Sequence, residues 1–89
     1  MCRRMAEITW LDITNKPDPW ISLEEALEMT PAKMQTLGWI IYDSGDHIII
    51  ASTIDTLEDM VGDVNCIPKG TILEIVLLPE SNIQDFCDK

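Results

Sequence analysis

The chain has few basic residues, and it has none in its middle. Its 89 residues include six Lys or Arg against sixteen Asp or Glu, which gives a formal net charge of −10. Between Lys33 and Lys69 there is no basic side chain, whereas six acidic side chains fall in that interval. Proteins that bind nucleic acids draw most of their affinity from Lys and Arg that neutralise phosphates. The composition therefore argues against direct binding of DNA or RNA.

Motifs that carry catalysis or hold a cofactor are missing as well. The chain has no glycine-rich phosphate loop, no Walker sequence and no HExxH zinc motif. His47 is the only histidine, and neither a nucleophile elbow nor a Cys–His signature accompanies it. The stretch Asp43-Ser44-Gly45-Asp46 supplies too few spaced oxygen ligands for a calcium loop. We therefore expect a protein that is not an enzyme and that holds neither a metal nor a cofactor.

The cysteines are few and are not arranged for a disulfide framework or a metal. There are three, Cys2, Cys66 and Cys87, and no C-x-x-C pair occurs. Small disulfide-stapled domains use more cysteines, so we expect free thiols in a reducing compartment. Arg3 and Arg4 are followed by no apolar signal-peptide region, and no apolar run approaches the roughly 20 residues of a membrane span. These absences predict a soluble, cytoplasmic protein.

What the chain does contain is a series of apolar segments, long enough for one domain. With 89 residues, 46% of them apolar, it can build one core. Residues 33–78 contain four apolar or alternating segments, which turn signals such as Pro68-Lys69-Gly70 separate. The acidic segment 53–62 is expected to be a loop with at most one helical turn. The four expected strands are residues 33–42, 47–52, 63–67 and 71–78.

These strands predict a mainly β fold, a small barrel of about five strands with one short helix before it. The fifth strand is residues 7–13, which we expect to cover a barrel edge. Gly38, inside the strand at 33–42, indicates a sharp bend of the kind found at a barrel corner. The single domain then divides into an N-terminal strand and Pro-rich loop (1–19), a short helix (20–32), the barrel (33–79) and a tail (80–89).

The short helix is expected at residues 23–29. Ser22 can accept a hydrogen bond from the amide of Glu25, and Glu25 can reach back, which is the capping-box pairing. A helix of two turns is not stable alone, so it must pack on other elements. Its apolar face is expected to be buried and to close one open end of the barrel. That face consists of Leu23, Ala26 and Leu27.

Two tryptophans are candidate binding residues. Trp39 lies mid-strand and is either a core residue or a platform for stacking. Trp20 lies in a loop before the helix, where burial explains it less well, and exposed tryptophans mark ligand or protein contacts. Trp10 is expected to pack with Trp20 over the barrel mouth. If one aromatic residue binds a partner, we expect it to be Trp20.

The charged candidates are three carboxylates and one lysine. Asp55, Glu58 and Asp59 make the segment 53–62 acidic, and this acidity either keeps the protein soluble or meets a basic surface on a partner. Lys69 is either a solvated turn residue or, in a ring of subunits, one of several lysines that converge on a small anion. Asn65, in the strand before it, can add amide hydrogen bonds.

The order of these segments resembles the Sm-like and SH3-like small barrels. In those folds a short helix precedes five strands, and a tight helical turn separates the last two, where Pro68-Lys69-Gly70 lies in this chain. The match covers residues 20–78, and the missing basic residues do not fit the RNA binding of Sm-like proteins. The chain is also similar to small bacteriophage and prophage accessory proteins, on the stretches Trp10-x-Asp12-Ile13, Pro31-Ala32, Gly38-Trp39, Ile50-Ala51-Ser52 and Ile67-Pro68-Lys69-Gly70.

The phage resemblance implies an accessory role in infection, such as interference with host defence in the bacterial cytoplasm. The leading hypothesis is a non-enzymatic, homo-oligomeric binding module that inhibits a host factor. It either docks on a host protein or sequesters a small nucleotide-like ligand between subunits. The alternatives are an Sm-like RNA-binding protein and an acidic mimic of a nucleic acid.

Overall fold

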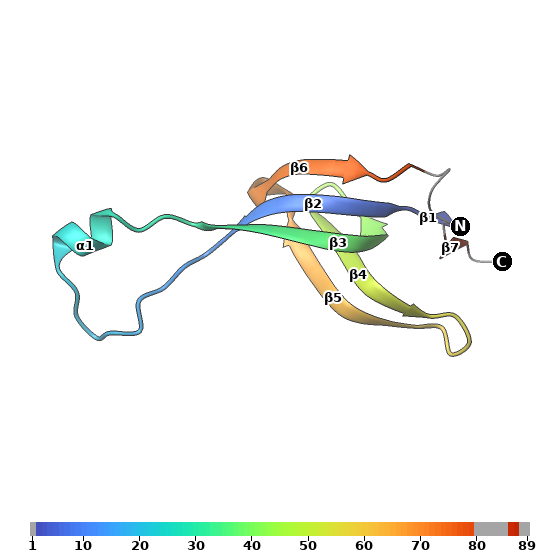
Figure 1. Cartoon of the computed structure of the whole chain (residues 1–89), viewed down its shortest axis with the longest axis horizontal. Coiled ribbons are helices and arrows are strands. Elements are labelled where there is room, and N and C mark those ends of the chain that lie inside the picture. The colour runs from blue at the N-terminus through green and yellow to red at the C-terminus, as the bar shows by residue number, and fades with distance from the viewer. Residues whose placement is uncertain (1, 80–85, 88–89) are drawn as a thin grey trace.

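A five-stranded antiparallel sheet forms the body of the protein. We describe a computed structural model at residues 2–79 and 86–87. The strands lie in the order β5-β4-β3-β2-β6, so the last long strand returns to lie beside the first (Figure 1). This mainly β fold with one short helix confirms the fold class predicted from the sequence. The sheet consists of β2 (Met5–Asp12), β3 (Ala32–Asp43), β4 (His47–Asp55), β5 (Met60–Pro68) and β6 (Ile72–Leu77).

Four short elements complete the described chain. The helix α1 (Leu23–Leu27) lies between β2 and β3, and the 3-10 helix η1 (Lys69–Thr71) joins β5 to β6. At the opposite end from α1, β1 (Cys2–Arg3) pairs with β7 (Phe86–Cys87). The segment 80–85 of the expected tail lies outside the described residues. No helix in the described part of the chain is long and apolar enough to cross a membrane.

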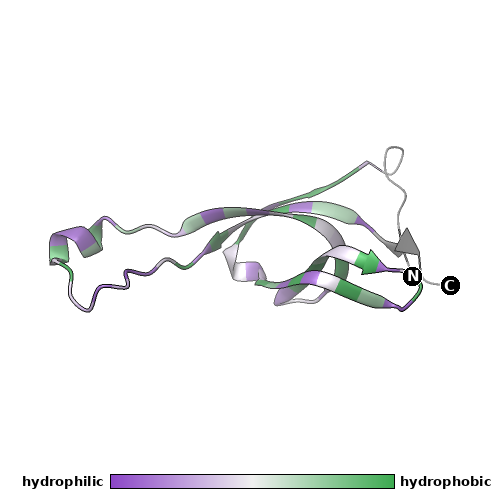
Figure 2. Cartoon of the chain, turned by 60° about the horizontal axis from the view of Figure 1, so that its bottom comes forward, coloured by the Kyte–Doolittle hydropathy of each residue, from purple (hydrophilic) through white to green (hydrophobic). Residues whose placement is uncertain are grey.

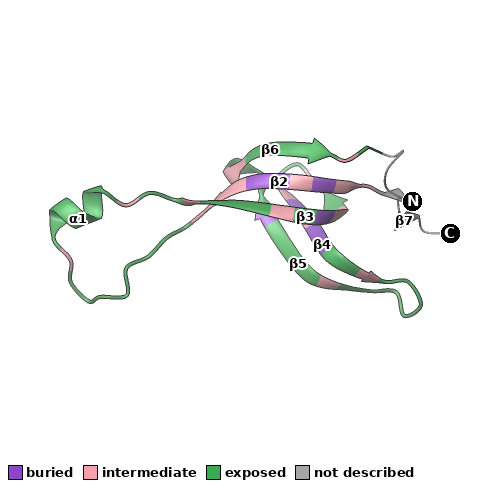
Figure 3. Cartoon of the chain, viewed as in Figure 1, coloured by how far each residue is buried: buried purple, intermediate pink, exposed green. Residues whose placement is uncertain are grey.

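The core lies on one face of the curved sheet, where the isoleucine-rich strand β4 is central. Ile48 and Ile50 are buried, and Ile48 is opposite the buried Ile67 of β5. Ile8 of β2 completes the buried cluster, against which Trp10, Ile40 and Ile72 pack. Side chains alternate between faces along a strand, so the nearly continuous apolar run of β4 is explained by burial on both of its sides. Figure 3 shows that the buried residues are confined to the sheet.

The sheet is curved but open. Among the described residues β5 and β6 form its two edges and do not pair with each other, so the closed barrel expected from the sequence is not seen. The curvature has local causes. The pairing of β3 with β4 shifts register between Ile40 and Tyr42, and that of β2 with β6 shifts between Thr9 and Trp10. Such bulges bend a strand and increase its twist.

Gly38 marks the bend predicted in β3. A Cβ at this position would overlap the backbone carbonyl oxygen of Ala51 and lie 2.8 Å from its carbonyl carbon. Only glycine permits this close approach of the two backbones. Next to it, the Ser52 hydroxyl donates to the carbonyl of Leu37 across 2.9 Å. The glycine thus allows β3 to press against β4 where the sheet curves.

The expectations for two segments of the sheet were wrong. Residues 53–62 are not one loop: β4 continues to Asp55, β5 begins at Met60, and their ends pair from Thr53↔Gly62 to Asp55↔Met60 around a turn at residues 56–59. The N-terminal strand does not cover an edge, because β2 hydrogen-bonds with both β3 and β6 inside the sheet. Local sequence does not show that acidic residues lie at the exposed ends of paired strands. It also does not show that β2 has a partner on both sides.

The helix does not close the sheet. Residues 13–31, here called the arm, extend away from the sheet with α1 at the far end (Figure 1). No residue of α1 is buried, and Leu23 and Leu27 are exposed. The expected contact of Trp10 with Trp20 is also wrong, since Trp10 packs at the core while Trp20 is exposed on the arm. The predicted cap by Ser22 is confirmed, since the amide of Glu25 donates to Ser22 Oγ across 3.1 Å, while the carboxylate of Glu25 accepts from the Ser22 hydroxyl at 3.5 Å.

Candidate functional site

The turn between β4 and β5, here called the hairpin tip (residues 55–60), is held in shape by its own acidic residues. Asp55 Oδ1 accepts hydrogen bonds from the amides of Leu57 and Glu58, at 3.0 and 3.1 Å. This arrangement is an Asx turn, in which a carboxylate replaces a backbone acceptor. Asp59 has φ of 55°, a left-handed conformation that Asp adopts more readily than most residues. Asp55 and Asp59 therefore shape the turn.

The same hydrogen bonds present Leu57 and Glu58 to solvent. Leu57 is 92% exposed, and Met60 beside it is exposed as well. Glu58 makes no side-chain hydrogen bond or ion pair in the described part of the chain. A leucine that stays in solvent between carboxylates contributes almost no hydrophobic stabilisation to its own fold. The hairpin tip is thus a protruding surface with an apolar centre and an acidic rim.

The arm is the second surface that presents apolar side chains. Trp20 is 91% exposed, and the neighbouring Leu23 and Leu27 on α1 are 76% and 77% exposed. The two limbs of the arm are joined near its base, where the Thr14 hydroxyl donates to the carbonyl of Thr30 across 2.9 Å. At the same place the limbs border an open hollow of about 390 Å³, which residues 14–16, residue 25 and residues 28–30 line. The arm therefore makes few contacts that would fix it on its own chain.

Lys69 and Asn65 do not form an anion site in one chain. Lys69 Nζ lies 2.7 Å from Asp43 Oδ1, so its charge is already balanced by the turn between β3 and β4. The amide of Lys69 also donates to the carbonyl of Asp46 across 2.9 Å, which ties η1 to that turn. Asn65 lies exposed on β5 opposite Ile50. The role of Lys69 within the chain is to join two turns.

Trp39 is half-buried in the middle of the sheet, as its position in β3 predicts. It is opposite Ala51 on β4 and Met5 on β2. Its indole nitrogen is buried and has no hydrogen-bond partner among the described residues. Cross-strand neighbours share a face of the sheet, so the side chains of Ala51 and Met5 flank the indole ring of Trp39. Trp39 contributes to packing between the strands.

The turn between β3 and β4 holds a hydrogen-bonded carboxylate, that of Asp46. Asp46 Oδ1 accepts a hydrogen bond from Ser44 Oγ at 2.7 Å and lies 2.7 Å from His47 Nδ1. The hydrogen bond from Ser44, followed by the hydrogen bond and the charge of His47, lowers the pKa of Asp46 below its ordinary value. The Ser44 hydroxyl also donates to the carbonyl of His47 and accepts from its amide, so the network stabilises a tight turn.

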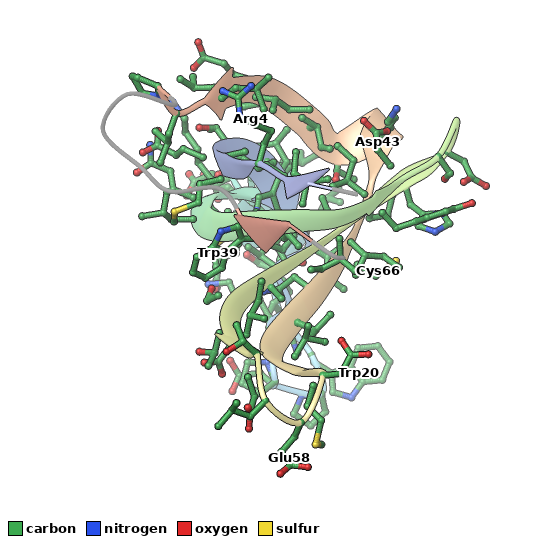
Figure 4. All side chains as sticks on the ribbon, turned by 90° about the vertical axis from the view of Figure 1, so that its right-hand side faces the viewer. Arg4, Trp20, Trp39, Asp43, Glu58 and Cys66 are labelled. Carbon is green, nitrogen blue, oxygen red and sulfur yellow. The ribbon has the colours of Figure 1, made fainter. Side chains whose placement is uncertain are left out.

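The structure therefore separates the residues that the sequence offered as candidates. Asp55, Glu58 and Asp59 lie together at the hairpin tip, while Trp20 lies on the arm at the other end of the molecule (Figure 1). Figure 4 views the molecule along its long axis, so Trp20 and Glu58 appear near each other only in projection. One surface that joins Trp20 with the acidic residues does not exist within one chain.

Leu57 is the residue that sequence reasoning missed. Its position between Thr56 and Glu58 in an acidic segment is the signal that could have found it, since a large apolar residue in such a turn lacks an obvious core contact. The exposed apolar side chains of β6 were missed for another reason. Their alternation predicts a strand, and only the sheet order shows that this strand is an edge.

No group of three or more His, Cys, Asp or Glu side chains is placed to hold a metal ion within the described residues. Comparisons of the chain with family models, with curated proteins and with solved structures find no match. A proposal for function must therefore come from the two exposed surfaces themselves.

Proposed function

We propose that the chain is a non-enzymatic binding module that docks its hairpin tip on a protein partner. The observation that carries this proposal is Leu57, which is 92% exposed at the end of a hairpin whose turn Asp55 holds with two hydrogen bonds. An exposed leucine gains free energy when a partner supplies an apolar pocket that removes it from water. The hairpin positions Leu57 in solvent, and the partner buries it.

The residues of the hairpin tip indicate what kind of surface the partner has. Asp55, Glu58 and Asp59 surround Leu57 and face no cation of the described chain. A complementary surface has an apolar pocket with Lys or Arg at its rim, because opposite charges steer association and fix the orientation of docking. A groove that normally holds nucleic acid has this character, so an acidic mimic of nucleic acid is one form of the same function.

The competing mechanisms gain less support from the structure. Sequestering a nucleotide-like ligand requires free basic groups, but Lys69 is paired with Asp43. Binding of RNA requires a basic face, and β3, β4 and β5 contain no Lys or Arg after Lys33. The resemblance to bacteriophage accessory proteins suggests where to look for the partner. We propose that it is a factor of the bacterial host cytoplasm, such as a defence protein.

The test is capture of a partner from a bacterial lysate by the immobilised full chain and by two variants. Leu57→Ser and Glu58→Lys change the two tip side chains that make no contact within the described chain, and they leave Asp55 and Asp59 to hold the turn. We expect both variants to lose the captured protein, and we expect capture by the unchanged chain to weaken as salt is raised.

The matched control is Glu24→Lys, which makes the same charge change on α1 at the other end of the molecule. It should retain the partner. A partner that is lost equally with Glu24→Lys and Glu58→Lys would show that net charge, and not the hairpin tip, governs capture. A partner that both tip variants retain would overturn the proposal.

A further inference from the structure

The arm lacks the contacts that a helix of its size requires. The helix α1 has five residues, and none of them is buried. Helices this short are not stable in water without packing of their apolar face. Figure 2 shows hydrophobic residues on α1 at the end of the molecule, where no other element covers them. The arm is therefore expected to have a partner surface outside its own chain.

The total surface of the chain is large enough to require such a partner. The chain exposes 6710 Å², whereas a compact monomer of this mass exposes about 5,300 Å². Its radius of gyration is 16.8 Å, against about 12 Å for a compact domain of this length. The excess surface exceeds the roughly 800 Å² that each partner contributes to a standard protein interface. A second copy of the chain can cover this excess on both molecules at once.

Strand β6 offers the apolar surface that fits the arm. Ile75 is opposite Ile8 in the pairing of β6 with β2, and Leu77 is opposite Ala6. Cross-strand partners share a face of the sheet, so Ile75 and Leu77 extend the face that carries the core. They are nevertheless 40% and 50% exposed, so their own chain covers them only in part. An uncovered apolar edge strand is a surface that proteins normally protect.

Charge favours β6 over β5, the other edge, as the place where the arm binds. The arm is acidic, with four carboxylates against Lys16 alone. Edge β5 carries Asp63 and ends at the acidic hairpin tip, so it would repel the arm. Edge β6 carries Glu74 as its one charged residue and lies away from the acidic hairpin tip, so it repels the arm less than β5 does.

We propose that the chain forms a two-fold homodimer in which the arm of each copy packs on β6 of the other. Leu23, Leu27 and Trp20 of one copy cover Ile75 and Leu77 of its partner, and the reverse contact is made by symmetry. The helix thereby covers the open face of the sheet in the second copy instead of its own. This proposal uses surfaces separate from the hairpin tip and does not rest on the function proposed above.

Sedimentation equilibrium of the full chain over a range of concentrations tests the dimer. Leu23→Glu places a charge on the arm, and Leu77→Lys places one on β6. Each should weaken dimerisation by about 30-fold or more, the usual effect of losing an anchor residue at an interface. Leu57→Ser, which alters a still more exposed leucine at the hairpin tip, is the control and should leave the dimer unchanged. Circular dichroism checks that every variant keeps its sheet.

Mixing the two variants distinguishes this dimer from others. A mixed dimer of Leu23→Glu with Leu77→Lys keeps one intact arm on one intact β6, and its other contact brings opposite charges together. We therefore expect the mixture to dimerise more tightly than either variant alone.

Three results would overturn the proposal. They are a monomeric unchanged chain at all concentrations, a dimer that neither variant weakens, and a dimer that Leu23→Glu weakens but Leu77→Lys does not, which would place the arm elsewhere. Failure of the hairpin tip in partner capture would leave this dimer unaffected, so the two proposals fail separately.

Discussion

At the scale of single residues, Gly38 is the glycine whose replacement would cause the most severe steric overlap. A methyl group at this position would overlap the carbonyl of Ala51, and backbone atoms on the neighbouring strand cannot move aside as a flexible side chain can. Gly38→Ala is expected to lower the free energy of unfolding by about 2–3 kcal/mol, the effect of overpacking a well-packed site. Urea unfolding followed by tryptophan fluorescence measures this change.

Gly45→Ala is the matched control for Gly38→Ala. No atom lies within 4 Å of a Cβ placed on Gly45. Its effect should stay within about 0.5 kcal/mol, as for most surface substitutions. Equal losses at both positions would mean that chain entropy, and not the contact with Ala51, makes Gly38 necessary.

At the scale of elements, the turn between β3 and β4 links stability to pH. The pKa of Asp46 is lowered in the folded chain by Ser44 and His47, so the charged carboxylate favours folding. A group with a lowered folded pKa contributes stability above its unfolded pKa and loses it as the pH falls through the folded pKa. We therefore expect the melting temperature to fall as the pH drops below the ordinary value of 3.8.

The variant Asp46→Asn isolates this contribution. Its melting temperature should be lower than that of the unchanged chain at neutral pH, and the difference should shrink in acid. Thermal scans from pH 7 to pH 3 give both curves. A constant difference across this range would show that Asp46 acts through the shape of the turn and not through its charge.

Elements also show how far local sequence predicts this fold. The strands and the capped helix were predictable because apolar alternation and the Ser22–Glu25 pairing are local signals. The end of β4 was not, because Thr53 and Asp55 are exposed in a paired strand and resemble a loop in sequence. The position of α1 was not predictable either, since an apolar helix face indicates burial but does not indicate where. The hairpin tip was predicted as acidic, while its exposed leucine depends on the turn geometry.

At the scale of the whole molecule, the proposed dimer makes stability depend on concentration. Association that occurs only in the folded state stabilises that state by mass action. The melting temperature should therefore rise as the protein concentration is raised a hundredfold. Leu23→Glu should abolish this rise, whereas Leu57→Ser should retain it. A melting temperature that does not change with concentration for the unchanged chain would argue against a folded dimer.

The order of the strands has a consequence for synthesis. Ala6 pairs with Leu77, so β2 obtains its second neighbour only from the end of the chain. Closing so long a loop is entropically costly and slows folding, because the chain loses entropy before the distant contact contributes any stability. While the ribosome is still making β6, one edge of β2 has no partner. The exposed edge of β2 can then pair with other polypeptides, until β6 forms and covers it.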